Sequence, residues 1–510
     1  MPSYPELLPD HPLHATTSFY CPPDKTDDPP FSRLRFHQIW RGVKEVANAT
    51  LSTSISMICI CSLNLISLGF IGTLKDPSMT GGIGLGFVFS NCCAFVLLSG
   101  VNIGVNVLAA QAFGANKNSL VSLNYHRGLF VILVLLLPIL VLLAFTKQIL
   151  MLFTIGPEIA HYASEYIFYA YPSFLFFGIF DCTKSYLYAQ NIFKPILFTQ
   201  ATTTTFHFFW SWFFIIHLQM GPAGAGLAKN VAEFSNMIIL FLYIYYSDSC
   251  DKTWVPFSKI QWRRAVLQWK GMKHFVATVI PLSAMLFLDM LCFEVFSVIA
   301  ALLGQDQLAV HVDLANTVTI YYGVPLGISI AVMTFVANSM GKNKPQAAKN
   351  YTWYGLILSL LSTGVFIVIL LVLREKWADL FGANEEIRGL LLKVLDIYFI
   401  FILFDGIQVI LSGTIKGIEK QNIATFGLFV CYYVIALPVI VLLAFKFEMK
   451  VQGIWYGFLG GIILLLGVYG LILTRTNFKA QAVKIRNNCN EENIGCTEAD
   501  DAEIQPYSMY

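Results

Sequence analysis

Apolar residues gather in twelve long runs between residues 47 and 473 of this 510-residue chain, and short polar segments separate the runs. A helix of about 20 residues is long enough to cross a bilayer. The pattern therefore predicts an all-α membrane protein with twelve transmembrane helices. The runs are residues 47–74, 81–113, 126–145, 160–190, 195–218, 224–246, 275–303, 309–338, 352–373, 391–418, 425–445 and 451–473.

The composition excludes a soluble protein of this length. Apolar residues make up 56% of the chain and charged residues 13%, whereas soluble domains carry about 25% charged residues. A net charge of +2 gives no electrostatic indication of a nucleic-acid partner. The sequence lacks paired CxxC motifs, so we expect no metal site. It also lacks GxxxxGK[ST], HExxH and GxSxG, so we expect neither nucleotide binding nor an enzyme.

Basic residues orient the predicted helices, because Lys and Arg concentrate in cytosolic loops. The segment 247–274 is the most basic internal loop. With both termini in the cytosol, this loop is cytosolic and links two halves. The predicted organisation is a cytosolic tail 1–46, a six-helix lobe 47–246, the linker 247–274, a second six-helix lobe 275–473 and a cytosolic tail 474–510, which its acidic, polar composition predicts to be disordered.

The two lobes resemble each other in sequence. Gly100–Asn118 and Gly327–Pro345 agree at seven of 19 positions with a constant offset of 227, and Gln190–Phe198 and Gln421–Phe429 agree at five of nine. The similarities relate helices 1–6 to helices 7–12 in order. An even number of helices per repeat gives parallel repeats, an arrangement typical of transporters whose two bundles rock about a site between or within them. We therefore expect two pseudo-symmetric six-helix bundles.

Several motifs in these repeats resemble those of the multidrug and toxic compound extrusion (MATE) family. Ala110-Gln-Ala-Phe-Gly-Ala-Asn116 resembles the end of the family's second helix, and Val336-Ala-Asn-Ser-Met-Gly341 resembles the end of its eighth. Ser412–Gln421, Leu437-Pro438 and Gly453–Gly457 fit its later helices in order. Helix 1 has no acidic residue and helix 7 has Asp289-Met-Leu-Cys-Phe-Glu294, which is similar to the Glu-x4-Glu of eukaryotic members.

The resemblance implies proton-coupling roles for Asp289, Glu294 and Asp405, the last matching a family carboxylate in helix 10. A carboxylate in a membrane helix costs about 2.5–3.5 kcal/mol, so it persists where it faces a cavity or has a function. Asp289 and Asp405 each lie about 21 Å into their helices, near the membrane centre. We expect no basic partner for them in the second half of the chain. Five residues turn a helix by about 140°, so Glu294 is expected to face away from Asp289.

Other polar side chains are candidates for the substrate site. A buried aromatic cluster suits an organic cation through cation–π contact. The candidates are Asn316, Tyr321, Tyr322, Tyr432, Tyr433 and Gln111. In the first half, the spacing of Asp181 and Lys184 predicts a local ion pair, and Lys229 is expected to reach the membrane interface.

Together these features predict a secondary antiporter that exports organic cations, drugs or toxic metabolites in exchange for protons, without a cofactor. Sodium is an alternative coupling ion, because carboxylates serve either ion. Export of organic anions and flipping of a lipid-linked substrate are alternative functions. We expect a multi-pass protein of the plasma membrane or a vacuolar or vesicular membrane that acts as a monomer on a small solute within the lipid bilayer.

Overall fold

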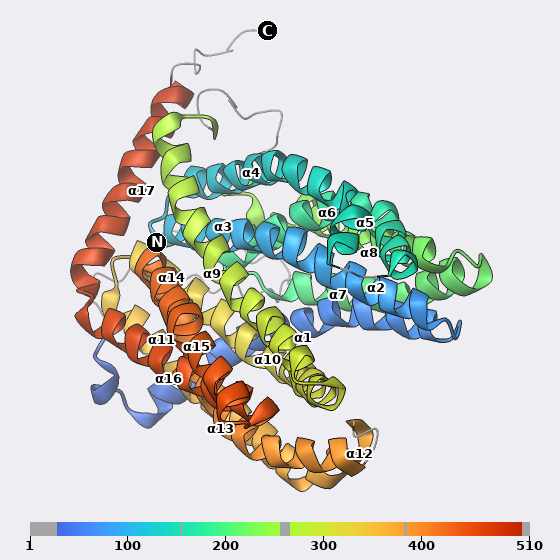
Figure 1. The fold of residues 1–510 in the computed structure, drawn as a ribbon. Coiled ribbons are helices and arrows are strands. Elements are labelled where there is room, and N and C mark those ends of the chain that lie inside the picture. Colours follow the sequence, from blue (N-terminus) through green and yellow to red (C-terminus); the bar gives the residue numbers. More distant parts are fainter. Residues whose placement is uncertain (1–27, 154–155, 256–265, 382–384, 502–510) are drawn as a thin grey trace, which may run out of the picture.

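The computed structural model describes residues 28–153, 156–255, 266–381 and 385–501, and within them every regular element is helical. The helices form two bundles that lie side by side (Figure 1). The N-terminal bundle comprises α1 (Phe36–Gly72), α2 (Pro77–Ser90), η2 (Asn91–Phe95), α3 (Val96–Gly114), α4 (Asn118–Ala144), α5 (Thr146–Leu152), α6 (Pro157–Ala189), α7 (Lys194–Ser211), η3 (Trp212–His217) and α8 (Gly221–Tyr246).

The C-terminal bundle repeats this layout. It comprises α9 (Trp269–Leu302), α10 (Gln305–Gly341), α11 (Pro345–Val372), α12 (Arg374–Phe381), α13 (Glu385–Gly417), α14 (Gln421–Phe429), η7 (Val430–Ala436), α15 (Leu437–Val441), η8 (Leu442–Lys446) and α16 (Lys450–Arg475). Along the chain, the short helix η1 (Phe31–Arg33) precedes the N-terminal bundle and η4 (Asp248–Cys250) follows it, and a terminal helix, α17 (Phe478–Asp501), follows α16.

Each of the twelve predicted runs coincides with one helix or one continuous helical unit. Among the described residues, ten of these units are long and apolar enough to span a membrane. The other two are α6 and the unit formed by α7 and η3, and α6 packs along α8. The low hydropathy of α6 has a physical cause, since it carries Glu158, Glu165, Asp181 and Lys184. The membrane-protein fold with about twelve crossings is confirmed.

Proline and turn residues set where these helices begin. Proline stands in the first turn of α2, α6, α7, α8 and α11, where its missing N–H leaves no bond unmade. The side chain of Asp76 caps α2 by accepting a hydrogen bond from the Met79 backbone at 3.1 Å. The turn between α3 and α4 contains Asn116 at φ 59°, and the turn between α10 and α11 contains Asn343 at φ 58°. The two bundles therefore reuse the same left-handed turn, as the sequence repeat predicts.

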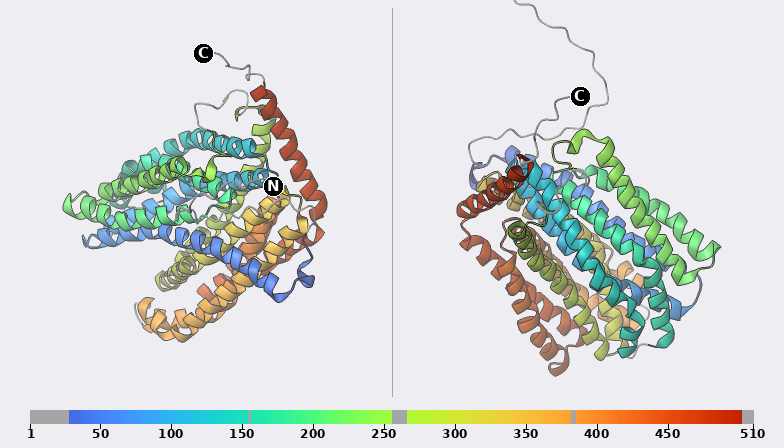
Figure 2. Two further views of the ribbon diagram at one scale, coloured as in Figure 1. Left: turned by 180° about the vertical axis from the view of Figure 1, so that it is seen from behind. Right: turned by 90° about the horizontal axis from the view of Figure 1, so that it is seen from above.

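The two bundles meet at one end and separate toward the other (Figures 1 and 2). We call the joined end, across which α17 runs, the α17 end. Its apolar core combines residues of α3, α4 and α6 with the start of α9 and the last turns of α10. A second core, from Met285 to Tyr469, contains residues of the C-terminal bundle only, as far as the chain is described. The structure is thus closed at the α17 end.

Reciprocal glycine contacts form the seam at the closed end. A Cβ atom on Gly114 of α3 would lie 2.1 Å from the carbonyl oxygen of Asn338 on α10, and a Cβ atom on Gly341 would lie 2.1 Å from that of Gln111 on α3. These two contacts are related by the repeat offset of 227 residues. Gln111 also donates a hydrogen bond to the carbonyl of Gly417 at 3.2 Å. Glycine is required here because the two backbones approach too closely for any side chain.

The seam gives a first prediction. Gly114→Ala is expected to lower the melting temperature in detergent, because the added methyl group overlaps backbone that has to shift; overpacking of this kind costs about 1–3 kcal/mol. Gly364→Ala in α11 is the matched control, since nothing lies within 4 Å of its Cβ position. Equal melting temperatures for the two variants would show that the seam is not tightly packed.

The terminal helix α17 corrects the expectation of a disordered tail. Its buried residues Phe478, Ala482, Ile485 and Cys489 recur at helical spacing, so they form one apolar face. This face belongs to the core at the α17 end. The Gln481 side chain donates a hydrogen bond to the carbonyl of Ile418 at 2.9 Å. The tail is therefore an amphipathic helix packed across both bundles.

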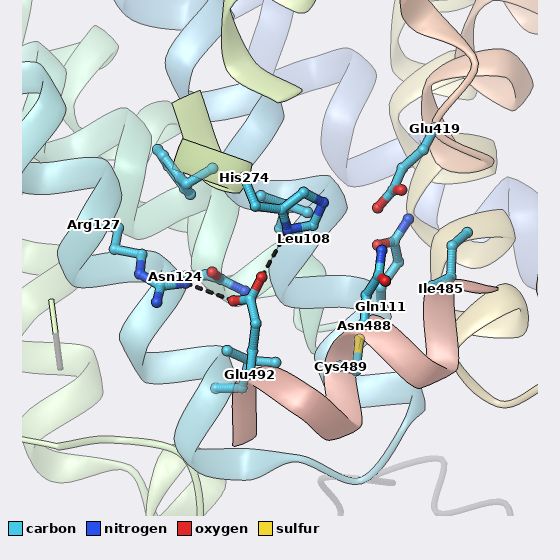
Figure 3. Close-up of a pocket in the computed structure, with 12 residues that line it drawn as sticks. Leu108, Gln111, Asn124, Arg127, His274, Glu419, Ile485, Asn488, Cys489 and Glu492 are labelled. Atoms are coloured by element: carbon cyan, nitrogen blue, oxygen red, sulfur yellow. Dashed lines mark hydrogen bonds and ion pairs between the residues drawn. The ribbon is translucent and has the colours of Figure 1, made fainter. Parts of the chain in front are cut away.

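At its far end, α17 is tied to both bundles by one carboxylate. Glu492 accepts hydrogen bonds at 2.7 Å from Arg127 of α4 and at 2.7 Å from Nδ1 of His274 of α9 (Figure 3). Arg127 is only 1% exposed. Burial opposes ionisation of Glu492, but the hydrogen bond from His274 and the positive charge of Arg127 outweigh it and lower the pKa of this carboxyl group. The ion pair is therefore fully charged near neutral pH.

Candidate transport site in the C-terminal bundle

Two acidic side chains lie near each other inside the C-terminal bundle. Asp289 is half-buried on α9 and Asp405 is buried on α13. Their carboxylates are close enough for their charges to interact. The Oδ2 atom of Asp405 has no hydrogen-bond partner among the described residues. A buried carboxylate oxygen without a donor is costly, so this position is suited to a proton or a cation.

Tyrosines surround the two aspartates. The charges of both carboxylates reach Tyr322 of α10 and Tyr432 of η7, and that of Asp289 reaches Tyr433. The Tyr433 hydroxyl donates to the carbonyl of Leu288 at 2.7 Å. These two η7 residues stand on a π-helical turn, an irregularity that occurs often at functional sites. The structure therefore brings three of the predicted tyrosines to the aspartates.

Tyr321 lies in the same region, but its hydroxyl group is hydrogen-bonded to other residues of the protein. It is 4% exposed, and its hydroxyl contacts Thr363 and the carbonyl of Ile402, each at 2.9 Å. The charge of Asp405 also reaches it. This geometry gives Tyr321 the task of packing α10 against α11 and α13.

Sequence reasoning missed two further residues, Tyr469 of α16 and Tyr398 of α13. Tyr469 is fully buried and interacts with the charge of Asp289, and Tyr398 is buried and interacts with that of Asp405. No motif marks either position. Aromatic residues form 15% of the chain, so their type alone carries no information about the site.

A lysine also reaches the aspartates, which corrects the expectation that they have no basic partner. Lys416 stands in the last turn of α13 and is half-buried, and its charge interacts with that of Asp289. It follows Asp405 by 11 residues, about three helical turns, so the two share a face of α13. Lys416 lies within the predicted run 391–418 but was not considered there as a partner for the aspartates. With Asp289, Asp405 and Lys416 ionised, the group carries one net negative charge.

The remaining predicted residues lie apart from this group. Glu294 is half-buried and lies near Cys92 of η2 in the N-terminal bundle. No interaction with either aspartate is found for it among the described residues, in line with the 140° rotation. Asn316 is exposed on α10, and Gln111 lies in the seam at the α17 end. The structure does not bring these three residues together with the tyrosines.

The N-terminal bundle contains its own buried charges. Asp181 and Lys184 of α6 form the predicted ion pair, and Asn102 of α3 donates to Asp181 at 2.8 Å. Lys229 does not reach the interface as predicted. It is 7% exposed, donates to Asn64 at 3.1 Å and lies 4.2 Å from the centre of the Phe95 ring. The amide and the ring stabilise its charge inside the bundle.

Glu233, one turn after Lys229 on α8, is also buried and was not predicted. It accepts a hydrogen bond from Asn236 at 3.3 Å and interacts with the charges of Lys229, Lys184 and Asp181. These two acids and two bases can therefore compensate one another within the N-terminal bundle. Among the described residues, no group of three or more His, Cys, Asp or Glu residues could hold a metal ion.

Comparisons with known proteins find the family that the sequence motifs resemble. The family model MatE matches residues 53–213 and 281–442, one segment in each bundle. The chain is similar to Protein DETOXIFICATION 16 of Arabidopsis thaliana, with 27% identity over 85% of this chain and 88% of the relative, and to DETOXIFICATION 17 of the same plant, with 27% identity over 91% and 96%.

Solved structures show the same fold. The crystal structure of the eukaryotic MATE transporter AtDTX14 matches with a TM-score of 0.81 and 23% identity, covering 89% of this chain and 99% of that chain. A Vibrio cholerae MATE transporter, VcmN in the bent form, matches with a TM-score of 0.74 and 16% identity over 90% and 99%. The matched segments, the repeated bundles and the relatives agree, and the chain belongs to the MATE family of multi-pass membrane efflux transporters and is not an enzyme.

Proposed function

We propose that this transporter is a secondary antiporter that exports small organic cations in exchange for protons, with coupling at Asp289 and Asp405 and a contribution from Glu294. The observation that carries the proposal is the proximity of Asp289, Asp405 and Lys416, which together carry one net negative charge when all three are ionised. One proton or one monovalent cation neutralises this group, but the two together do not bind favourably. Competition for one site is the linkage that an exchanger requires.

The surrounding tyrosines support an organic cation as the exported solute. Tyr322, Tyr432 and Tyr433 are close enough to interact electrostatically with Asp289. Aromatic faces attract cations, and more strongly where water is excluded. A carboxylate beside three aromatic rings therefore suits a cation with an apolar body. Asn316 and Gln111 are farther candidates, and their contact with substrate stays a prediction.

The seam supports a mechanism in which the two bundles rock. At the α17 end, Gln111 bonds to Gly417 at 3.2 Å, and Asn338 of α10 bonds to the carbonyl of Ala189 of α6 at 3.1 Å. Opening this end requires these bonds to break while the opposite end closes. Because Lys and Arg favour cytosolic loops, we assign the α17 end and both termini to the cytosol. The structure then corresponds to an outward-open state.

Export of organic anions remains the second candidate, because Lys416 lies within reach of Asp289. The two aspartates outnumber this lysine, so an anion would meet net repulsion at the site. Protonation of both aspartates would be needed before an anion could bind. The charge balance therefore favours cations.

Proteoliposomes test the proposal. Vesicles containing the purified transporter and loaded with a fluorescent organic cation are expected to lose the dye when the outside is acidified, and not when a sodium gradient is imposed at constant pH. Empty vesicles measure the passive leak. Efflux driven by sodium alone would replace the proton as the coupling ion, whereas a failure to move any cation under either gradient would contradict the proposal.

A further inference from the structure

A groove outside the transport site runs along the junction of α14, α16 and α17. Its volume is about 630 Å³, within the range of small-molecule sites. It lies at the α17 end, where α16 stops at Arg475 and the chain turns into α17. Its lining includes Lys420, Ile423, Val468, Leu471, Arg475 and Lys484.

The charge of this groove is uniformly positive. Lys420, Arg475 and Lys484 line it, and no acidic residue does. None of these three cations has a carboxylate oxygen within 4 Å in the described part of the chain. Two acids at this end have basic partners of their own, Glu492 with Arg127 and Glu491 with Lys270. Lys484 also interacts with the charge of Glu419, but Glu419 does not line the groove. The three cations around the groove therefore form a site for an anion.

The other wall of the groove is apolar. Ile423 and Leu471 are 57% and 56% exposed. Ile423 belongs to the membrane-spanning unit that begins with α14, and Leu471 belongs to the membrane-spanning helix α16. Leu471 precedes Arg475 by one helical turn, so an apolar surface at the edge of the membrane lies directly beside a basic one. A free phosphate ion would use only the cations. A phospholipid would use both surfaces.

We propose that this groove binds an anionic phospholipid, with the headgroup phosphate on Lys420, Arg475 and Lys484 and the acyl chains along Ile423, Val468 and Leu471. Basic pockets between membrane helices bind such headgroups. The lipid would contact α14, α16 and α17 at once and would hold α17 against the C-terminal bundle, next to the hydrogen bond from Gln481 to Ile418. This site depends on neither the coupling ion nor the exported solute.

Native mass spectrometry and thermal melting of the full chain in detergent test the site. Dioleoylphosphatidylglycerol is expected to remain bound and to raise the melting temperature, and dioleoylphosphatidylcholine is not. The triple variant Lys420→Gln, Arg475→Gln and Lys484→Gln is expected to weaken phosphatidylglycerol binding by about 100-fold, since each basic residue contributes about 1 kcal/mol near an anionic surface.

Two control variants make the result specific. The triple variant Lys44→Gln, Lys479→Gln and Arg486→Gln removes the same charge from exposed residues that do not line the groove, and should bind the lipid as the wild type does. The charge-preserving exchange of Lys420→Arg, Arg475→Lys and Lys484→Arg should retain most of the binding, which separates loss of charge from misfolding.

Three outcomes would overturn the proposal. The first is unchanged phosphatidylglycerol binding by the groove variant, and the second is an equal loss in the control variant with the same charge. The third is an equal rise in melting temperature with inorganic phosphate alone, which would identify a free anion as the occupant. Selective loss in the groove variant, without an effect of phosphate, would support it.

Discussion

Asp289→Asn is expected to abolish cation efflux driven by a pH gradient, with a loss of at least about 100-fold. The amide has the shape of the carboxyl group but neither binds a proton nor carries a charge near neutral pH. It also leaves Asp405 and Lys416 with a net charge of zero, so the site loses its attraction for a cation. The dye-loaded proteoliposomes described above measure the effect directly.

Conservative variants distinguish the roles of Asp289, Asp405 and Glu294. Asp289→Glu retains the charge and is expected to recover part of the efflux. Asp405→Asn should lose coupling as Asp289→Asn does, because the two carboxylates interact. Glu294→Gln should lose less, since Glu294 lies near Cys92 rather than near the aspartates. Unaltered efflux in Asp289→Asn, in protein with a normal melting temperature, would move the coupling site to Asp405 or Glu294.

Glu492→Gln is expected to lower stability by about 3–5 kcal/mol, because removing one member of a buried ion pair leaves the other charge uncompensated. Here the remaining charge is Arg127, which is 1% exposed. The neighbouring substitution Glu491→Gln is the control. Its partner Lys270 is 83% exposed, and exposed pairs contribute about 0–1 kcal/mol. Thermal melting of the two variants in the same detergent compares them.

The stabilisation from Glu492 has a defined pH dependence. The pKa of Glu492 is lowered in the folded protein, so its contribution is present above the unfolded value of about 4.3 and is lost as the pH falls through the folded value. The difference between wild type and Glu492→Gln should therefore shrink as the pH falls below about 4. An unchanged difference at acid pH would show that ionisation of Glu492 does not stabilise the fold.

The positions of the membrane helices could be predicted from the sequence because runs of about 20 apolar residues have few other uses. The residues at which the helices begin and end were less predictable. For example, α9 begins at Trp269, six residues before the predicted run, since backbone hydrogen bonding continues where the chain leaves the lipid. The paired aspartates were predictable as well, because acids are rare in membrane helices.

The predictions were wrong where a segment was interpreted from its overall composition and not from the spacing of its residues. The terminal segment was judged by its acidic residues, yet Phe478, Ala482, Ile485 and Cys489 already had the spacing of a helix with one buried face. Lys416 was overlooked as a partner, although it lies within the predicted run 391–418 and its spacing from Asp405 places both residues on one face. Tyr469 and Glu233 could not have been predicted, because only the packing of separate helices brings them to their partners.

The reciprocal glycine contacts have the symmetry of an interface between two identical chains. Gly114 packs on Asn338 while Gly341 packs on Gln111, and the repeat offset exchanges one contact for the other. This is the arrangement of an isologous dimer interface, in which a single patch contacts its own copy across a two-fold axis. A six-helix chain with one such glycine would form both contacts on pairing in parallel with itself. The seam therefore has the two-fold symmetry of a homodimer interface within a single polypeptide.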